Sequence, residues 1–178
     1  TASWTLSNAG STVLASDTAP DGTSAFEVTE TILNVGHSIA NTGAASINPS
    51  IPVTSGSIYT QSIFIKKSTG SIDWAQMTFS GAAFPTTQYA NFNLSTGSIG
   101  NFSGTSPKIE LFPNGWYRCS ITSTATSTAS SNGVIVNFIN NTDTTTRGPT
   151  YTGSTANKLK LAMGQFEAGS FPTSYIPN

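Results

Sequence analysis

The fold prediction starts from one segment, Asn114-Gly115-Trp116-Tyr117-Arg118-Cys119-Ser120-Ile121-Thr122. Asn-Gly is the strongest short signal for a β-hairpin, because both central residues of the tight turn need a positive φ. Apolar and polar residues then alternate, which is typical of a half-buried strand. The side predicted to face the core carries Tyr117, Cys119 and Ile121. The side predicted to meet water carries Trp116, Arg118 and Ser120.

The same alternation recurs along the chain in roughly ten short runs separated by turns. The clearest are residues 57–67, 72–80, 88–95 and 158–167, and the run 108–112 pairs with the opening segment. Residues 97–106 are rich in Gly and Ser and are expected to be a connection. No stretch shows sustained helical periodicity. The sequence therefore predicts an all-β protein, a jelly-roll β-sandwich of two antiparallel sheets without substantial helix, in a single domain over residues 1–178.

The composition limits the classes of partner. Charged residues make up 8% of the 178 residues and the net charge is −1, against about 25% charged residues in an average soluble domain. Ser, Thr, Asn and Gly must therefore cover the surface, which suits an extracellular or virion protein. We expect no nucleic-acid partner, because the chain has no basic excess. No run of about 18 apolar residues is present, so we expect no membrane insertion.

Signals for catalysis are weak. The chain has one cysteine, Cys119, on the apolar side of its strand, and one histidine, His37. The acidic residues are scattered, and neither a Gly-x-Ser-x-Gly elbow nor Cys/His zinc spacing occurs. We therefore expect a protein that is not an enzyme.

The outward strand positions suggest a binding face instead. Aromatic rings can cover the C–H faces of sugars, while amides and Arg offer paired hydrogen bonds to hydroxyl groups. Spacing of i, i+2 places a ring beside a polar group on one side of a strand. The candidate carbohydrate-binding residues are Trp74, Gln76, Tyr89, Asn91, Trp116, Arg118, Phe64, Lys66 and His37.

Each candidate residue also has a plain structural interpretation. The aromatics could lie under loops or at sheet edges, and His37 could be an ordinary loop or strand residue. Arg118 could form a salt bridge with Glu110 across the hairpin. The binding hypothesis requires the strands that carry the candidates to share one sheet face, and the pairing of these strands is not fixed by local sequence.

Several segments, in this order, resemble one family: Ala19-Pro20-Asp21-Gly22-Thr23, Tyr59-Thr60-Gln61-Ser62 with Lys66, Phe92-Asn93-Leu94-Ser95-Thr96-Gly97, Asn114 to Cys119, and Gln165 to Pro177. The chain is similar to concanavalin A-like jelly-roll domains of phage tail fibre, tail spike and virion proteins, which resemble carbohydrate-binding modules. Two positions depart from that pattern: Ala162 stands where an aromatic is common, and Gln61 where an apolar residue is usual.

The resemblance implies a non-catalytic module that binds a glycan or polysaccharide, in a phage tail or another extracellular assembly. The alternative is a structural virion domain whose aromatics anchor neighbouring subunits. Related jelly-roll modules often carry a structural calcium ion near the chain ends. Asp21, Glu30 and Glu167 could supply oxygen ligands for such an ion.

Overall fold

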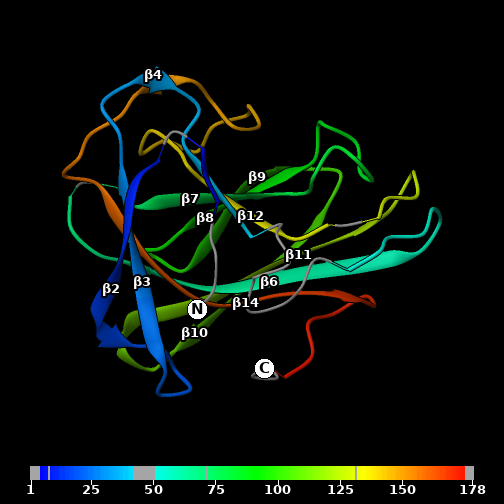
Figure 1. The fold of residues 1–178 in the computed structure, drawn as a ribbon, viewed down its shortest axis with the longest axis horizontal. Coiled ribbons are helices and arrows are strands. Elements are labelled where there is room, and N and C mark those ends of the chain that lie inside the picture. The colour runs from blue at the N-terminus through cyan, green and yellow to red at the C-terminus, as the bar shows by residue number, and fades with distance from the viewer. Residues whose placement is uncertain (1–4, 8, 42–50, 71, 131, 175–178) are drawn as a thin grey trace.

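The protein is a β-sandwich, seen in a computed structural model that describes residues 5–7, 9–41, 51–70, 72–130 and 132–174. Its two six-stranded antiparallel sheets lie face to face (Figure 1). The sequence also predicts a short strand over residues 44–47, and this segment lies outside the described residues. In the described part of the chain, no helix is long and apolar enough to cross a membrane.

Sheet 1 contains, in spatial order, β1 (Thr5–Ser7), β5 (Ser38–Asn41), β12 (Val134–Phe138), β7 (Trp74–Thr78), β8 (Tyr89–Asn93) and β9 (Ser98–Ser103). Sheet 2 contains β10 (Ser106–Phe112), β11 (Trp116–Thr124), β6 (Ile58–Lys67), β14 (Lys158–Ala168), β3 (Ser24–Glu30) and β2 (Ala9–Thr18). A third, small sheet pairs β13 (Tyr151–Thr152) with β4 (Asn34–Val35).

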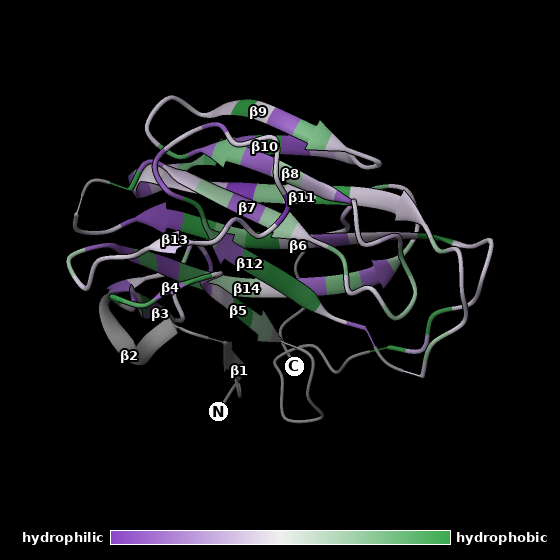
Figure 2. Ribbon diagram, turned by 90° about the horizontal axis from the view of Figure 1, so that it is seen from above, coloured by the Kyte–Doolittle hydropathy of each residue, from purple (hydrophilic) through white to green (hydrophobic). Residues whose placement is uncertain are grey.

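The connectivity is that of a jelly roll. The consecutive strands β5, β6 and β7 alternate between the sheets, and so do β11, β12 and β14. Because of this wrapping, β14 pairs with both β3 and β6, and β12 pairs with both β5 and β7. Figure 2 shows β9 and β10 together at one edge of the sandwich, with β1 and β2 at the other. The predicted all-β jelly-roll sandwich is confirmed.

The predicted hairpin is present. Strands β10 and β11 pair with Glu110 opposite Arg118 and are joined by the short turn η1 (Pro113–Gly115). Asn114 has φ 62° and Gly115 has φ 76°. Both values are positive, as the Asn-Gly signal requires. On β11, Cys119 and Ile121 are fully buried, so the alternation places the predicted apolar side in the core.

The core fills the space between the sheets. Its large side chains come from both layers and include Ile39, Ile63, Ile65, Met77, Phe79, Phe84, Phe92, Ile121, Val136, Phe138, Leu159, Leu161 and Phe166. One polar residue, Gln61, is also fully buried on the inner face of β6. Its side-chain amide donates a hydrogen bond to the Thr78 carbonyl (2.8 Å) and accepts one from the Ile135 amide (3.2 Å). Gln61 therefore links the two sheets without leaving its amide unsatisfied.

A β-bulge changes the last long strand. Ala162 pairs with Phe64, but Gln165 pairs with Ser62, so β14 has one more residue than β6 over this span. Met163 lies in the bulge with φ 53°. The extra residue reverses the alternation, as a bulge must. Regular alternation over residues 158–167 predicts that Met163 faces the core together with Leu159 and Leu161. This prediction was wrong, because Met163 belongs to a second, outer apolar cluster.

Residues 97–106 are not simply a connection. They contain β9, which forms the edge of sheet 1 beside β8. The prediction missed this strand because Gly and Ser are frequent in its sequence and most of its residues are exposed, so no apolar alternation marks it.

Candidate functional site

The candidate residues do not form one site. Trp74, Gln76, Tyr89 and Asn91 lie on β7 and β8 of sheet 1, whereas Phe64, Lys66, Trp116 and Arg118 lie on β6 and β11 of sheet 2. The inner faces of the sheets form the core, so the outward faces of the two sheets lie on opposite sides of the sandwich. The expected single binding face was therefore wrong.

On sheet 1, the outward amides hold a loop. Residues 139–150 cover β7 and β8, and Gln76 and Asn91 are fully buried beneath them. The Gln76 amide donates to the Thr146 carbonyl (3.0 Å) and accepts from the Gly148 amide (2.6 Å). The Asn91 amide donates to the Asp143 carboxylate (2.9 Å). These contacts use the hydrogen-bonding groups that the binding hypothesis assigned to a sugar.

The two aromatics of sheet 1 are partly covered as well. Tyr89 is buried apart from a small exposed fraction of 6%, and Trp74 is half-buried. Trp74 packs beside Gly100 of β9, where a Cβ atom added to the glycine would come within 2.5 Å of the indole. Neither ring is fully exposed, so neither has a whole face open for stacking on a sugar.

On sheet 2, the two aromatics are buried outside the main core. Trp116 is 1% exposed, Phe64 is 3% exposed, and both belong to the outer apolar cluster, Ala19, Ala25, Phe64, Trp116, Ala162 and Met163. The Trp116 indole donates a hydrogen bond to the Thr18 carbonyl (3.1 Å) at the end of β2. The prediction that Trp116 meets water was wrong, because the turn after β2 folds over it.

Lys66 and His37 also have structural partners. Lys66 forms an ion pair with Asp17 (2.7 Å). His37 is 1% exposed, and its ring nitrogens lie 3.2 Å from the Thr31 hydroxyl and 3.2 Å from the Tyr151 carbonyl. These two candidates therefore stabilise the fold in the structure.

Arg118 differs from the other candidates, because its guanidinium is half-buried on a face that stays partly open. It lies 5.8 Å from the centre of the Phe64 ring. Its Nη2 donates to the Ser62 hydroxyl and to the Thr173 carbonyl. Burial lowers the pKa of the guanidinium from its ordinary value.

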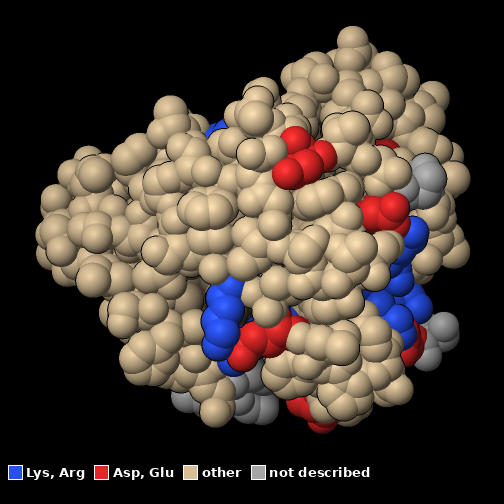
Figure 3. Space-filling model, turned by 180° about the vertical axis from the view of Figure 1, so that it is seen from behind, with Lys and Arg blue, Asp and Glu red and all other residues tan. Residues whose placement is uncertain are grey.

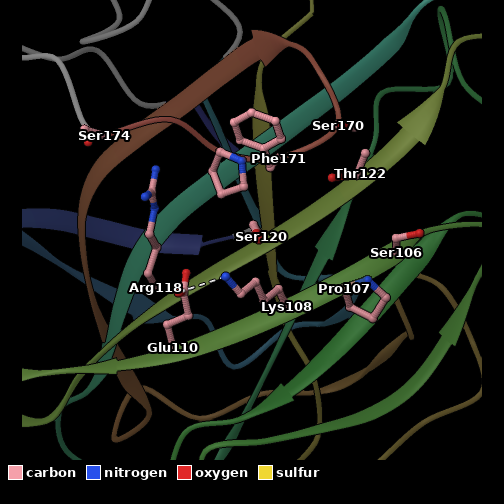
Figure 4. A pocket seen from close by; sticks show the side chains of 11 residues that line it. Ser106, Pro107, Lys108, Glu110, Arg118, Ser120, Thr122, Ser170, Phe171 and Ser174 are labelled. Atoms are coloured by element: carbon pink, nitrogen blue, oxygen red, sulfur yellow. Dashed lines mark hydrogen bonds and ion pairs between the residues drawn. The ribbon is translucent and has the colours of Figure 1, made fainter.

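A groove runs beside Arg118 between the hairpin and the tail, which we define as residues 169–174. Its volume is about 630 Å³. The lining residues are Ser106, Pro107, Lys108, Glu110, Arg118, Ser120, Thr122, Ser170, Phe171, Pro172 and Ser174. We call this feature the tail groove. Figure 4 shows the side chains of β10 and β11 on one side of it and Phe171 on the tail opposite them.

The tail is held by side chains of sheet 2. Thr173 donates its amide to Glu167 (3.0 Å) and its hydroxyl to the same carboxylate (2.7 Å). Gln165 donates to the Thr173 hydroxyl (3.0 Å). Phe171 is not held in this way and is 67% exposed. The tail is therefore held against sheet 2 through Thr173, while the Phe171 ring stays exposed beside the groove.

The three carboxylates considered for calcium have separate partners. Asp21 accepts hydrogen bonds from Thr23, and Glu167 accepts them from Thr173. Glu30 is fully buried and accepts hydrogen bonds from Tyr151, the Ser154 amide and Asn157. No group of three or more metal-ligating side chains occurs in the described part of the chain. The three carboxylates therefore do not converge on one site.

Sequence reasoning identified one residue of the tail groove, Arg118. It missed Phe171, Lys108 and Glu110 as site residues, since the groove depends on how the tail folds back over the hairpin. The sequence carried one usable signal: a large apolar residue, Phe171, stands between Ser170 and Pro172 in a segment without strand alternation. No protein-family model and no curated protein sequence matches the chain.

Proposed function

We propose that this protein is a non-catalytic carbohydrate-binding module and that the tail groove holds the glycan. The observation that carries the proposal is an open groove that combines hydroxyl groups, a guanidinium and an exposed phenyl ring. The sparsely charged surface of the protein and its resemblance to virion jelly-roll domains support an extracellular or phage-tail setting. Figure 3 shows how few charges lie on one face of the molecule, with most of it formed by uncharged residues.

The chemistry of the groove matches that of a sugar. The exposed residues Ser106, Ser170 and Ser174 line the groove, and their hydroxyl groups can donate and accept hydrogen bonds with sugar hydroxyls. The Phe171 ring can cover a C–H face of a sugar, at a gain of about 0.5–1.5 kcal/mol if aromatic pairs are a guide.

A glycan array followed by affinity electrophoresis tests the proposal. We expect Phe171→Ala to weaken the binding of the best glycan about 3- to 10-fold, the range that a stacking loss of this size predicts. Trp74→Ala, on the opposite sheet, is the matched control and should bind like the natural protein. Unchanged binding by Phe171→Ala, or no bound glycan on the array, would refute a carbohydrate site in the tail groove.

A structural virion role is a second candidate, favoured by the edge that β9 and β10 form. Three large apolar side chains are exposed there: Leu111 (70%), Phe102 (54%) and Ile99 (39%). Exposed apolar residues on edge strands are typical of surfaces that pair with another chain. Analytical ultracentrifugation tests this role: it predicts an oligomer that dissociates on Phe102→Ser and Leu111→Ser, and a monomer at all concentrations would contradict it.

A further inference from the structure

The cations of the protein differ in their partners. All five lysines form ion pairs: Lys66 and Lys160 with Asp17, Lys67 with Asp73, Lys108 with Glu110, and Lys158 with Glu27. Among the described residues, neither Arg118 nor Arg147 has a carboxylate oxygen within ion-pair distance. Of these two arginines, Arg118 is the one that lines the tail groove.

The surroundings of Arg118 fix its position, while Glu110 and Glu167 act on its charge only from beyond ion-pair distance. Both of its hydrogen bonds leave from Nη2 and reach neutral oxygens, those of Ser62 and Thr173. Its Nε is buried without a partner. A half-buried cation with neutral partners is poorly compensated, so a negative group that reaches it gains more than it would at an exposed lysine.

The nearby carboxylates are already engaged. Glu110 lies directly opposite Arg118 in the hairpin but pairs with Lys108 (2.9 Å). Figure 4 shows this ion pair below Arg118, which extends away from it toward the tail. Glu167 accepts hydrogen bonds from the Thr173 amide and from the Thr173 hydroxyl. The salt bridge between Arg118 and Glu110, which was the alternative interpretation of Arg118, is therefore not formed, and the guanidinium remains available to a ligand.

We propose that the tail groove selects acidic glycans, with a sugar carboxylate bound at Arg118 and the adjoining ring covered by Phe171. This inference rests on the proposed carbohydrate-binding function and names its ligand class. The carboxylate would approach the guanidinium from the groove and accept charge-assisted hydrogen bonds from Nη1, since Nη2 already donates to Ser62 and Thr173. Arg118 then decides specificity, while the hydroxyl groups of the groove contribute to the binding of acidic and neutral glycans alike.

The test measures how tightly the protein binds the two members of matched glycan pairs. Each uronic-acid or sialic-acid oligosaccharide is compared with its carboxyl-reduced, neutral counterpart by array and by calorimetry. We expect the acidic member to bind at least tenfold more tightly and to weaken as NaCl is added, because the ion pair is screened. Arg118→Gln should lose about 10- to 100-fold in affinity for the acidic member, the cost of losing a charged hydrogen bond.

Two further variants make the test specific. Arg118→Lys keeps the charge but not the planar guanidinium, so part of the acid preference should remain. Arg147→Gln is the matched control, since Arg147 is also half-buried but bonds to Phe79 on the other side of the sandwich. Thermal melting of each variant reports whether the fold is intact.

The outcomes separate the inference from the function on which it rests. If neutral and acidic members bind equally well in the tail groove, the acid preference is wrong and the carbohydrate function stands. An acid preference that persists in folded Arg118→Gln also overturns the role of Arg118. If no member of any pair binds, the carbohydrate function itself fails, and the inference fails with it.

Discussion

The outer faces of the two sheets are covered in different ways. On sheet 1, the loop of residues 139–150 lies on buried amides, Gln76 and Asn91, and leaves little of β7 and β8 exposed. On sheet 2, a turn covers Trp116 at one end and the tail covers β11 and β14 at the other, so that the tail groove stays open between tail and hairpin.

This difference shows that an outward strand position is not the same as a solvent-exposed position. In a sandwich with long connections, outward polar residues can satisfy the backbone of a loop, because buried backbone groups need partners. Outward aromatics can form a second apolar cluster beneath a turn. The residues free to bind a ligand are those that the connections leave uncovered.

The largest effect on stability should come from the covered end of sheet 2. Trp116→Ala removes a buried indole and its hydrogen bond to Thr18, so we expect the free energy of unfolding to fall by about 3–5 kcal/mol in urea denaturation. Trp74→Ala on sheet 1, which is half-buried, should cost about 1 kcal/mol. Equal losses for the two variants would mean that the two faces do not differ in this way.

Loss of the amide network on sheet 1 should have the next largest effect. Asn91→Ala removes hydrogen bonds to Asp143 and to the Thr144 carbonyl, and we expect a loss of about 2 kcal/mol. Hydrogen exchange should speed up at the Asn101 amide, which the same Asp143 carboxylate holds (2.7 Å). Slow exchange in the variant at this amide would contradict the anchoring role of Asn91.

The stability contributed by sheet 2 should depend on pH, because this sheet carries an ionic cluster around Asp17. Lys66 and Lys160 lower the pKa of Asp17 from 3.8 to about 2. A lowered pKa stabilises the folded state above pH 3.8, and this contribution is lost as the pH falls toward 2. Asp17→Asn should therefore cost about 1 kcal/mol at pH 7, only a small part of that near pH 2, and nothing well below pH 2. A cost that does not change with pH would refute this account.

The smallest effect on stability should be at the exposed ring of the tail. Phe171 is 67% exposed. Phe171→Ala should therefore change the free energy of unfolding by less than about 0.5 kcal/mol. The same variant is expected to weaken glycan binding, so the two measurements together assign Phe171 to binding and not to folding. A large stability loss would show that the ring supports the tail.

Local sequence predicted the strands and their faces wherever a strand is regular and half-buried. The inward sets of β7 and β8 follow from alternation, and the Asn114-Gly115 turn follows from its need for positive φ. Met163 could not be predicted, because a bulge leaves no local signal in an apolar run. The burial of Trp116 depends on Thr18, 98 residues away in the chain, which no local pattern contains.

The site was harder to predict than the fold for the same reason. Tyr89 and Trp116 have similar outward patterns in sequence, but their sheets are assigned by pairings between distant strands. The outward position of Arg118 could be predicted because it lies in a strand with regular alternation. Its availability to a ligand depends on the pairing of Glu110 with Lys108, and local sequence does not say which of two nearby cations that carboxylate will bind.

The bulge in β14 determines on which side of the molecule the tail is fastened. Leu161 and Phe166 both face the core although they are five positions apart, an odd spacing that a regular strand would place on opposite faces. Without the extra residue of the bulge, Phe166 would turn outward, and Gln165 and Glu167 would turn into the core, away from Thr173. The extra residue of the bulge does not line the tail groove, but it exchanges the inward and outward positions of the rest of β14. The location of the ligand surface therefore depends on it.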